Sequence, residues 1–540
     1  MTSLLFGLRL SRWGITGFSL LALVLTFVQT VGFYQIAGHT PGGRAAFGAS
    51  MTRLAAQLVV LFPPPLRPDT VEGYVQFRGF QPLVILFGIW ALASATGFAR
   101  GDEERGIVEF ALAAGVSRPA LVASRAAGFG LALLVASAAA GAGFVIAVAT
   151  GGESLRAPGL IEACILLVAV GIACYALALL AAQLATARAA PALAGALLLV
   201  LFLANSLGRV FDWLSTWRWL SPFHYYELSQ PLPAGGYFDV RGLIVPLAMA
   251  VAATAVAAVA FIRRDLGAPL VRLPSGPHRL SRDATNIPLW RVPVLRGLYE
   301  RRLGLLAWSA GMAALAAIFV ALTRTIVEVL LSLPALLPYL SIFIHQQLYP
   351  AVLGYTYFDV AELMFAALAI TYVARWSAED TDGRLELVLS EPVSRAGVVL
   401  ERMAVLVVAG LVIAAVSGLT LSYASHQAGI DLSSQRVIAA SAMLVPFALV
   451  FAGAGSLLAA WNPRAALALV GAFAFASYLD NELATIYKLP AWVHDLSAFK
   501  LFGTPLLTGV DNRSLALMLL LALAGLGSSI LVMQRRDVGA

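Results

Sequence analysis

Two short acidic segments contain the side chains of this sequence whose types and spacing could do chemistry. The first reads GDEERGIVEF from residue 101, and the second reads AEDTDGRLEL from residue 378. Each places carboxylates before a glycine and one further glutamate three residues after it. These residues are Glu103, Glu104, Gly106 and Glu109 in the first segment, and Glu379, Asp380, Gly383 and Glu386 in the second. Carboxylates in this pattern can stabilise the start of a helix or make polar contacts with another protein.

A short helix is predicted directly after each of these glycines. The apolar residues that follow are too few to cross a membrane, so the helix should lie at the membrane surface. The predicted apolar faces are Ile107, Phe110, Ala111 and Ala114 in the first segment, and Leu385, Val388 and Leu389 in the second. Gly115 and Pro392 are expected to end these helices. Ser117 and Ser394 are expected to cap the long helices that follow.

Helix capping alone is the alternative interpretation of the acidic segments, because solvated, well-capped turns have the same composition. Two residues argue against it. Glu109 and Glu386 lie inside the predicted helices, away from the caps, and each follows a glycine by three residues. This recurrence in both segments weakens the interpretation that they serve as helix caps alone.

Other kinds of site find no support in the sequence. The lysines are Lys488 and Lys500, and neither follows Gly or precedes Ser or Thr, so the chain has no nucleotide-binding P-loop. Cys164 and Cys174 are ten residues apart on one apolar run, about 15 Å along a helix, which is too far for a disulfide. The histidines are scattered without metal-ligand spacing.

The elements that must position the acidic segments are membrane spans. Of the 540 residues, 60% are hydrophobic and 12% are charged, and the mean hydropathy is +0.85. These values predict an all-α polytopic membrane protein, since the apolar runs are continuous and do not alternate as strands would. About twelve runs approach the roughly 20 residues that a span needs. They lie near 14–36, 80–99, 120–149, 159–183, 191–211, 241–262, 303–323, 358–376, 397–425, 436–460, 465–480 and 514–533. The GAG sequences at Gly141 and Gly453 should let helices approach closely.

Arginine placement predicts the orientation of these spans. If both termini are cytoplasmic, most short inner segments carry arginine, as the positive-inside rule requires, and both acidic segments face the cytoplasm. The net charge of +7 then reflects topology, and no nucleic-acid partner is expected. The first run lacks a convincing cleavage site and is interpreted as a retained span in a multi-pass protein of the cytoplasmic membrane.

The chain repeats itself in two halves. Residues Gly106, Glu109, Ser117, Arg118 and Arg125 match Gly383, Glu386, Ser394, Arg395 and Arg402 at a constant offset of 277. The halves also close alike, with IRRDLGA from Ile262 and QRRDVGA from Gln534. We interpret the chain as a tandem duplication of six spans each, related by an axis along the membrane normal. The predicted parts are a first half at 1–265, a Pro- and Arg-rich cytoplasmic linker at 266–300 and a second half at 301–540.

The second acidic segment resembles a motif of the ABC-2 type permeases of ATP-driven exporters. Members of that family carry a pattern like E..GT.E.LL..P.SR after their second span, and GRLELVLSEPVSR from Gly383 is similar to it. The first copy, RGIVEFALAAGVSR, departs further, with Gly115 at the proline position and Ile107 at the threonine position; Arg384 replaces that threonine in the second copy. The whole chain looks most like the duplicated permeases of tetronasin or polyketide-antibiotic exporters.

This resemblance implies a fold, partners and a function. The fold would be the type V, ABCG-like fold, with one cytoplasmic coupling helix in each half. Two copies of a separate ABC ATPase subunit would bind ATP and magnesium, with no cofactor in this chain. The cargo would be a small hydrophobic or amphipathic compound, exported across a bacterial cytoplasmic membrane among membrane lipids. The coupling residues would be Glu103, Glu104, Gly106, Glu109, Glu379, Asp380, Gly383 and Glu386, with Arg118 and Arg395 anchoring the helices at the lipid headgroups.

The resemblance also implies a substrate path between the halves, lined by the second and fifth spans of each. Its candidate lining residues are Phe87, Trp90, Phe202 and Asn205 from the first half, and Phe365, Tyr372, Tyr478 and Asn481 from the second. Packing or lipid contact is the alternative for the aromatic residues, and capping near the outer face is the alternative for the two asparagines. The segments around Leu4–Trp13 and Val294–Arg302 are expected to form helices on the membrane surface, or else ordinary basic anchors.

Two other classes of protein compete with this interpretation. A twelve-span secondary transporter, such as a proton-coupled efflux pump, also has six-plus-six repeats. Its usual loop motif after the second span is basic, whereas both segments here are led by acids, and its outer loops are short, whereas 37–79 and 324–357 are long. A polytopic membrane enzyme would need a catalytic cluster in a loop, and the loop sequences HTPGGR and PPPLRPD contain no acid pair or metal set.

Overall fold

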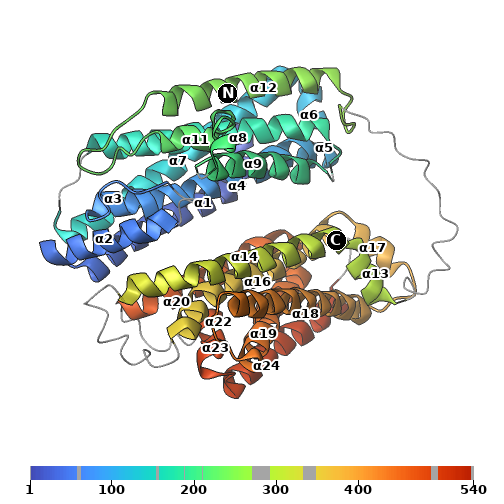
Figure 1. Cartoon of the computed structure of the whole chain (residues 1–540). Coiled ribbons are helices and arrows are strands. Elements are labelled where there is room, and N and C mark those ends of the chain that lie inside the picture. The colour runs from blue at the N-terminus through green and yellow to red at the C-terminus, as the bar shows by residue number, and fades with distance from the viewer. Residues whose placement is uncertain are drawn as a thin grey trace. The chain divides into compact units, whose positions relative to one another are not determined.

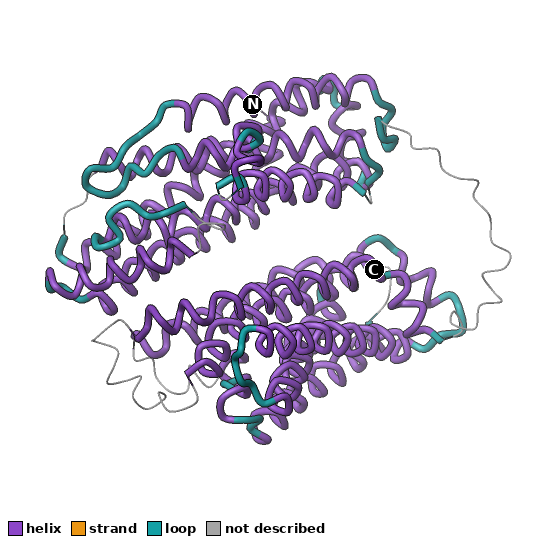
Figure 2. Tube along the Cα trace, in the orientation of Figure 1, coloured by secondary structure: helices purple, strands orange, loops and turns teal. Residues whose placement is uncertain are grey.

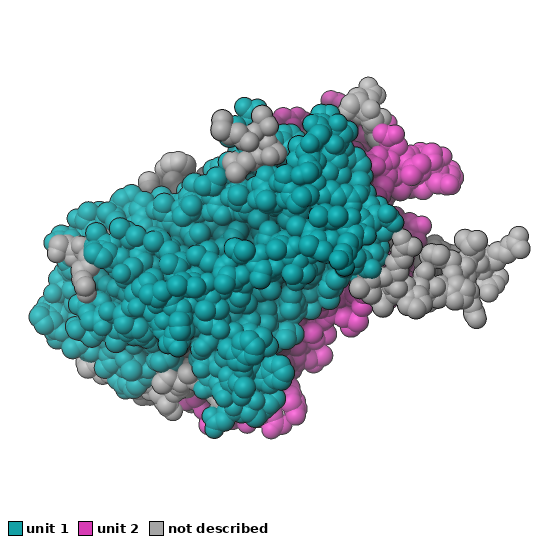
Figure 3. All heavy atoms as spheres, turned by 90° about the horizontal axis from the view of Figure 1, so that it is seen from above, with its two compact units in different colours: residues 1–277 teal, residues 278–540 magenta. Residues whose placement is uncertain are grey.

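The chain forms helices in all of its regular structure. The computed structural model describes residues 2–57, 63–153, 157–187, 189–209, 211–270, 292–331, 348–487 and 497–536. Among these, the sole strand-like feature is one isolated antiparallel bridge between Gln230 and Tyr237, and Figure 2 shows helix and loop throughout. Two compact units divide the chain, Met1–Pro277 and His278–Ala540, which Figure 3 colours separately. Most of the predicted linker at 266–300 lies outside the described residues.

The first unit is a bundle of long helices that run roughly side by side (Figure 1). Its elements are α1 (Thr2–Ala37), α2 (Pro41–Gln57), α3 (Val71–Val75), η1 (Gln76–Phe80), α4 (Gln81–Thr96), η2 (Gly97–Gly101), α5 (Asp102–Glu104), α6 (Ile107–Ala113), α7 (Arg118–Gly151), α8 (Ala157–Leu184), α9 (Ala190–Leu207), α10 (Asp212–Ser215), η3 (Arg218–Leu220), α11 (Pro222–Glu227) and α12 (Arg241–Arg263). Both η1 and η2 are π-helical, so α3 to α5 continue through them as one span.

The second unit has the same kind of architecture. Its elements are α13 (Pro293–Glu300), α14 (Arg302–Leu331), α16 (Leu348–Thr381), α17 (Arg384–Leu389), α18 (Arg395–Gln427), α19 (Ser434–Trp461), α20 (Pro463–Tyr487), α22 (Ala498–Phe502), α23 (Pro505–Thr508) and α24 (Asn512–Arg535). The short helices α6 and α17 each lie at one end of the bundle of their own unit (Figure 1).

An all-α polytopic membrane protein is confirmed, with one change in the number of spans. Within the described residues, eleven helices are long and apolar enough to cross a membrane. The predicted run at 465–480 falls in α20, where the apolar segment Ala465–Asn481 is shorter than the other spans. The predicted surface helix at the N-terminus is wrong as a separate element, because Leu4–Trp13 is continuous with the first span in α1. The segment at Val294 does form a helix of its own, α13.

Small residues let the long helices pack closely, as the GAG sequences predict. A Cβ on Gly143 of α7 would lie 2.1 Å from the carbonyl oxygen of Leu23 in α1. The hydroxyl of Thr26 donates a hydrogen bond of 2.7 Å to the carbonyl of Ala140 across the same contact. In the second unit, a Cβ on Gly453 of α19 would lie 2.8 Å from the carbonyl oxygen of Ala522 in α24. Backbones at this distance tolerate no side chain, so glycine is required there.

Candidate functional site

Each acidic segment is the end of a long helical span that stops in a turn at a left-handed glycine. We call residues 101–106 the first acidic turn and residues 378–383 the second acidic turn. Gly106 has a φ of 71° and Gly383 a φ of 72°, a conformation that favours glycine because it has no Cβ. The chain therefore leaves a long span, reverses direction at the glycine and begins a short helix in the same way in both units. The first turn also follows the π-helical η2, a distortion common at functional positions.

The short helices α6 and α17 pack on their bundles through Val108, Ala111 and Leu112 and through Leu385 and Leu389 respectively, and one side chain in each is fully buried. Val108 of α6 is 1% exposed and Leu385 of α17 is 2% exposed. On the other face, Phe110 is 71% exposed and Leu387 is 72% exposed. The predicted apolar face of α6 is therefore correct for Ala111, which packs on the core, and wrong for Phe110, which points away from the bundle. In α17, Leu385 was correctly predicted to be buried.

The ends of the short helices agree with the predicted signals in position. Gly115 adopts a φ of 86° after α6, and Ser117 and Ser394 occupy the N-cap positions of α7 and α18. The hydroxyl of Ser394 accepts a hydrogen bond of 3.0 Å from the amide of Gly397. Ser117 makes no such side-chain bond, so this cap is formed by backbone geometry alone.

Glu103 lies inside the first unit and takes part in a buried ion-pair cluster. Its carboxylate accepts hydrogen bonds from both terminal nitrogens of Arg264, one at 3.0 Å and one shorter, and from Arg100 at 3.2 Å. The side chains of all three residues are at most 3% exposed. We predicted Glu103 as an external coupling contact. The structure contradicts this, because the carboxylate is already saturated by two arginines of its own unit.

Arg100 also closes the end of a neighbouring helix. Its guanidinium donates to the carbonyls of Ala182 at 3.0 Å and Gln183 at 3.3 Å, at the C-terminus of α8. The last carbonyls of a helix have no partner within the helix, so a positive donor there is stabilising. The first acidic turn is thus fixed both to α8 and to the end of α12.

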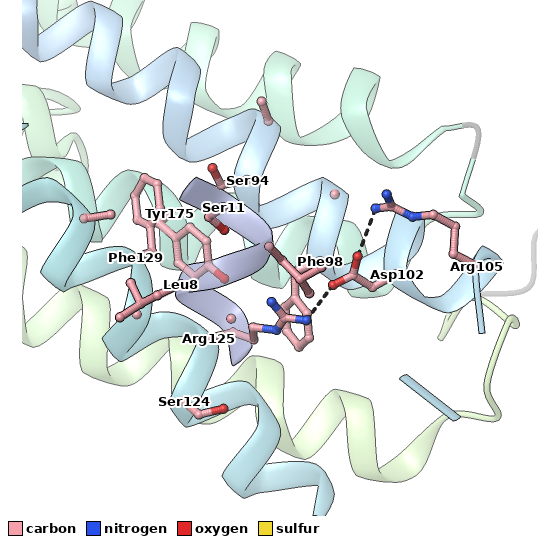
Figure 4. A pocket seen from close by; sticks show the side chains of 16 residues that line it. Leu8, Ser11, Ser94, Phe98, Asp102, Arg105, Ser124, Arg125, Phe129 and Tyr175 are labelled. Carbon is pink, nitrogen blue, oxygen red and sulfur yellow. Dashed lines mark hydrogen bonds and ion pairs between the residues drawn. The ribbon is translucent and has the colours of Figure 1, made fainter. Parts of the chain in front are cut away.

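Asp102 makes a second ion pair in the same turn. Its two carboxylate oxygens accept hydrogen bonds from Arg105 at 2.9 Å and from Arg125 of α7 at 2.8 Å (Figure 4). The side chains of Asp102 and Arg125 are each 9% exposed, whereas that of Arg105 is 63% exposed. The pair between Asp102 and Arg125 therefore connects the turn to α7 from inside the bundle.

The second acidic turn repeats these contacts. Glu379 accepts a hydrogen bond of 2.8 Å from Arg402 of α18, at the positions that correspond to Asp102 and Arg125. Asp380 accepts one of 2.5 Å from Arg536 at the end of α24, as Glu103 does from Arg264. The side chain of Asp380 is 10% exposed. Like Glu103, it is occupied within its own unit and is not a free contact for a partner.

Arg118 and Arg395 bind the ends of helices in their own units. The Nη1 of Arg118 donates to the carbonyls of Phe261, Ile262 and Arg264 at 2.8, 3.2 and 2.8 Å. The Nη1 of Arg395 donates in the same way to the last carbonyls of the second unit. Those acceptors are Met533, Gln534 and Arg536 at 2.8, 3.3 and 2.6 Å. Each arginine thus caps the last long helix of its unit, and anchoring at lipid headgroups stays a prediction.

The remaining carboxylates of the predicted set are available at the surface. Glu104, Glu109 and Glu386 are exposed, and within the described part of the chain none of them forms an ion pair. Glu109 precedes the exposed Phe110 in sequence, and Glu386 precedes the exposed Leu387. The arrangement offers a neighbouring partner one apolar and one acidic side chain from each short helix.

The aromatic residues predicted to line a path lie within the core of their own unit. Phe87, Trp90 and Phe365 are at most 4% exposed. Trp90, for example, stacks on Phe18 with ring centroids 4.7 Å apart. The others also have packing partners within their own unit: Phe202 packs on Phe223, Tyr478 on Phe499, and Tyr372 lies under the guanidinium of Arg301. A path between the halves along these aromatic side chains stays a prediction.

Asn205 belongs to a polar cluster at the opposite end of the first unit from the acidic turn. It is fully buried, its amide donates to Glu227 at 2.7 Å, and its carbonyl accepts from Arg218 at 3.3 Å. Arg209 also binds Glu227. These contacts explain the buried amide as a structural group. Asn481 lies half-buried on α20.

Sequence reasoning missed the arginine partners of the acidic turns. Arg264 and Arg536 are the second arginines of the recurring RRD sequences that close each half. Their recurrence was visible, but pairing with Glu103 or Asp380 was not, since the partners are more than 150 residues away. No group of three His, Cys, Asp or Glu side chains that could hold a metal occurs among the described residues.

Comparison with known families places these features in a class of transporters. A family model described as "Multidrug efflux system permease Rv1217c, C-terminal domain" matches residues 70–262 and 297–532. No curated protein matches the chain by sequence. The matched ranges contain both acidic turns, both short helices and most of the long helices, well over half of the chain. The chain therefore belongs to this family of multidrug efflux permeases, and it is a multi-pass membrane transporter rather than an enzyme.

Proposed function

We propose that this permease is driven by ATP as the membrane subunit of an ABC exporter, with α6 and α17 as its coupling helices. One observation carries the proposal. Each unit presents a short helix on a left-handed glycine, with an exposed apolar side chain beside an exposed glutamate, Phe110 with Glu109 and Leu387 with Glu386. An apolar anchor next to a charged group suits a cleft on a partner protein.

The attachment of the short helices fits the transmission of force. Buried ion pairs connect each acidic turn to the rest of its bundle, through Glu103 and Arg264 in the first unit and Asp380 and Arg536 in the second. Removing one partner of a fully buried pair, such as that of Glu103 and Arg264, costs about 3–5 kcal/mol, and the partly exposed pair of Asp380 and Arg536 contributes less. A push on α6 or α17 would therefore move the adjoining spans as a rigid group and not merely bend the turn.

The ATPase in this proposal is a separate protein. The sequence contains no P-loop lysine, so ATP and magnesium would be bound by two copies of a partner ABC ATPase subunit. Closure of those two subunits would push both coupling helices. The expected cargo is a small hydrophobic or amphipathic compound, moved out across the cytoplasmic membrane of a bacterium, with both termini of the chain in the cytoplasm.

A tandem duplication of an ABC-2 type half is part of the same proposal. It is supported by the repeated contacts of Arg118 and Arg395 with the last carbonyls of their units, and by the equal turns at Gly106 and Gly383. The resemblance to tetronasin and polyketide-antibiotic exporter permeases would then describe the whole chain. Each half would supply one docking site for one ATPase subunit.

Charge reversal on the coupling helices tests the proposal. The permease is purified from its host together with the P-loop subunit that accompanies it, and the complex is reconstituted in vesicles. Glu109→Arg and Glu386→Arg should leave insertion and thermal stability unchanged, because both side chains are exposed, yet reduce cargo-stimulated ATP hydrolysis. Glu386→Arg should have the larger effect, since its segment is closer to the family motif. The double variant should be the most impaired.

Two controls separate coupling from general damage. Asp431→Arg places the same charge change on an exposed position in the loop between α18 and α19 and should keep wild-type stimulation. The permease without its partner should hydrolyse no ATP. Wild-type stimulation in the double variant, at equal recovery of the partner, would reduce α6 and α17 to structural turns. Export sustained by a proton gradient in vesicles that lack any ATPase would favour a secondary transporter instead.

A further inference from the structure

The first unit contains a cavity of about 200 Å³ beside its acidic turn. The walls come from the N-terminal part of α1, the end of α4 with η2, and the facing sides of α7 and α8. Figure 4 shows the ion pairs of Asp102 with Arg105 and Arg125 on one side of it, and Phe129 and Tyr175 on another. Nothing in the proposed coupling mechanism uses this space.

The polar lining of the cavity consists of Asp102, Arg105, Arg125, Tyr175 and the hydroxyls of Ser11, Ser94 and Ser124; the buried hydrogen-bond donors without a partner among the described residues come from Arg125 and Tyr175. Each oxygen of Asp102 already accepts a hydrogen bond from an arginine, Arg105 or Arg125. Arg125 donates one hydrogen bond, from Nη2, so its Nε and Nη1 have no acceptor within the described part of the chain. Tyr175 is 2% exposed, and its hydroxyl likewise has no hydrogen-bond partner among the described residues. Two arginines against one carboxylate leave the lining with a net charge of +1.

The rest of the lining is aromatic and apolar. The ring of Phe129 stacks on that of Tyr175 with centroids 4.6 Å apart, and Phe98 lies 5.3 Å from the guanidinium carbon of Arg125. Leu8 of α1 completes this side. A buried cation with unused donors, next to aromatic faces, is complementary to a molecule with an anionic group and an apolar body.

We propose that this cavity binds the anionic group of an amphipathic molecule, held by Arg125 and Tyr175, with the adjoining apolar part against Phe98 and Phe129. The anionic group is a carboxylate, sulfonate or phosphate, which accepts hydrogen bonds without donating any when ionised. The volume of about 200 Å³ is below that of most drug-sized pockets. It therefore holds an aromatic acid, or the anionic end of a larger amphiphile. This site requires no ATPase and stands independently of the coupling mechanism.

The second unit offers a matched comparison. Arg402 forms the corresponding ion pair with Glu379 at 2.8 Å, but Val405 stands at the position that corresponds to Gly128. Gly128 lines the cavity, and a Cβ there would meet no atom within 4 Å. The cavity that Arg402 lines is about 20 Å³. An arginine paired with a carboxylate is thus common to both units, whereas the glycine that lines the cavity of the first unit is replaced by a valine in the second.

Direct binding to the full chain tests the site. The protein is placed in nanodiscs of phosphatidylcholine, and radiolabelled 2-naphthoate is measured by equilibrium dialysis beside 2-naphthylmethylamine, which has the opposite charge on the same ring. We expect the naphthoate to bind and the amine not to. Arg125→Gln should weaken binding about ten- to a hundredfold, the range for loss of a charge-assisted hydrogen bond. Tyr175→Phe should weaken it about two- to tenfold.

Two further variants make the test independent of folding defects. Gly128→Val fills the cavity without changing a charge, and it should abolish binding while thermal stability is kept. Arg402→Gln breaks the equivalent ion pair of the second unit and should leave naphthoate binding unchanged. Equal binding in wild type and Gly128→Val, or a loss with Arg402→Gln as large as with Arg125→Gln, would overturn the proposal.

An anionic lipid headgroup and a soluble amphiphile both provide an anionic group beside an apolar body. A second experiment distinguishes these two ligands. Native mass spectrometry of protein from nanodiscs with phosphatidylglycerol reports retained lipid. If a lipid occupies the cavity, phosphatidylglycerol should compete with naphthoate and be lost in Gly128→Val. If a soluble amphiphile is the occupant, naphthoate binding should be insensitive to the lipid. Binding of neither probe, or preference for the amine, would refute the site.

Discussion

Replacing Glu103 by Gln should destabilise the protein far more than the same change at its neighbour Glu104. Glu103 is bound by Arg264 and Arg100 with all three side chains at most 3% exposed. The substitution leaves two buried guanidinium groups close together without a counter-charge. Removing one partner of a buried ion pair costs about 3–5 kcal/mol. Glu104 is exposed, and surface changes of this type cost within about 0.5 kcal/mol.

The corresponding carboxylate of the second unit should give an intermediate result. Asp380 is paired with one arginine, Arg536, whose side chain is 21% exposed, and it is itself 10% exposed. Water can therefore solvate the arginine that Asp380→Asn leaves behind. We expect Asp380→Asn to lower the free energy of unfolding by about 1–3 kcal/mol, because the arginine it leaves unpaired keeps partial access to water.

Denaturant-induced unfolding of the purified permease in detergent, followed by intrinsic fluorescence, gives the free energies for this series. Each variant is compared with wild type at the same protein and detergent concentration. The reasoning predicts the order Glu103→Gln, then Asp380→Asn, then Glu104→Gln, from largest to smallest loss. A loss below about 1 kcal/mol for Glu103→Gln would show that the ion-pair cluster does not hold the turn. Equal losses at Glu103 and Glu104 would refute the assignment of one to the interior and the other to the surface.

Three further predictions follow from individual positions. His224 lies outside the spans, and burial lowers its pKa to about 4. An unfolded histidine titrates near 6.5, so the unfolded state binds a proton before the folded state does. The stability of the protein should therefore fall as the pH drops from about 6.5 to 4. The loss should be about 1 kcal/mol, since the ring is only half-buried and screened, and His224→Gln should remove it from pH-dependent melting curves. Single cysteines at Arg105 and Arg241 should differ towards an impermeant thiol reagent in intact cells, with protection at the first and labelling at the second; the reverse pattern would overturn the predicted orientation. Gly143→Ala should cost about 1–3 kcal/mol by overpacking against the Leu23 carbonyl, whereas Gly17→Ala, with no atom within 4 Å, should be neutral in thermal melts.

The fold could be predicted well from composition. Where the prediction of the fold is wrong, the error has a local physical cause. Long apolar runs identify spans because every backbone polar group must be satisfied within a helix in the membrane. The N-terminal segment was separated from the first span because Arg9, Arg12 and Trp13 suggested a surface helix. In the structure no proline interrupts the segment, and α1 continues through Gly14 and Gly17 as one helix from Thr2 to Ala37.

The candidate site could be predicted in part. The spacing of glycine and glutamate located both turns and both short helices. It did not distinguish Glu103 from Glu109, which differ in burial although they lie six residues apart. The buried face of a helix of seven residues is ambiguous when apolar residues occupy both sides, as Val108 and Phe110 do in α6.

The sequence by itself determined the membrane class, the positions of the acidic turns and the residues that recur in both halves. These depend on local quantities, namely hydropathy along the chain, the left-handed preference of glycine and residue spacing. Only the tertiary structure decided which carboxylates form ion pairs with arginines and which remain exposed. Glu103 meets Arg264 across 161 residues, and Asp380 meets Arg536 across 156. Such contacts arise only when the last long helix of each unit packs beside the turn, because a charge can be buried only where its partner is brought to it.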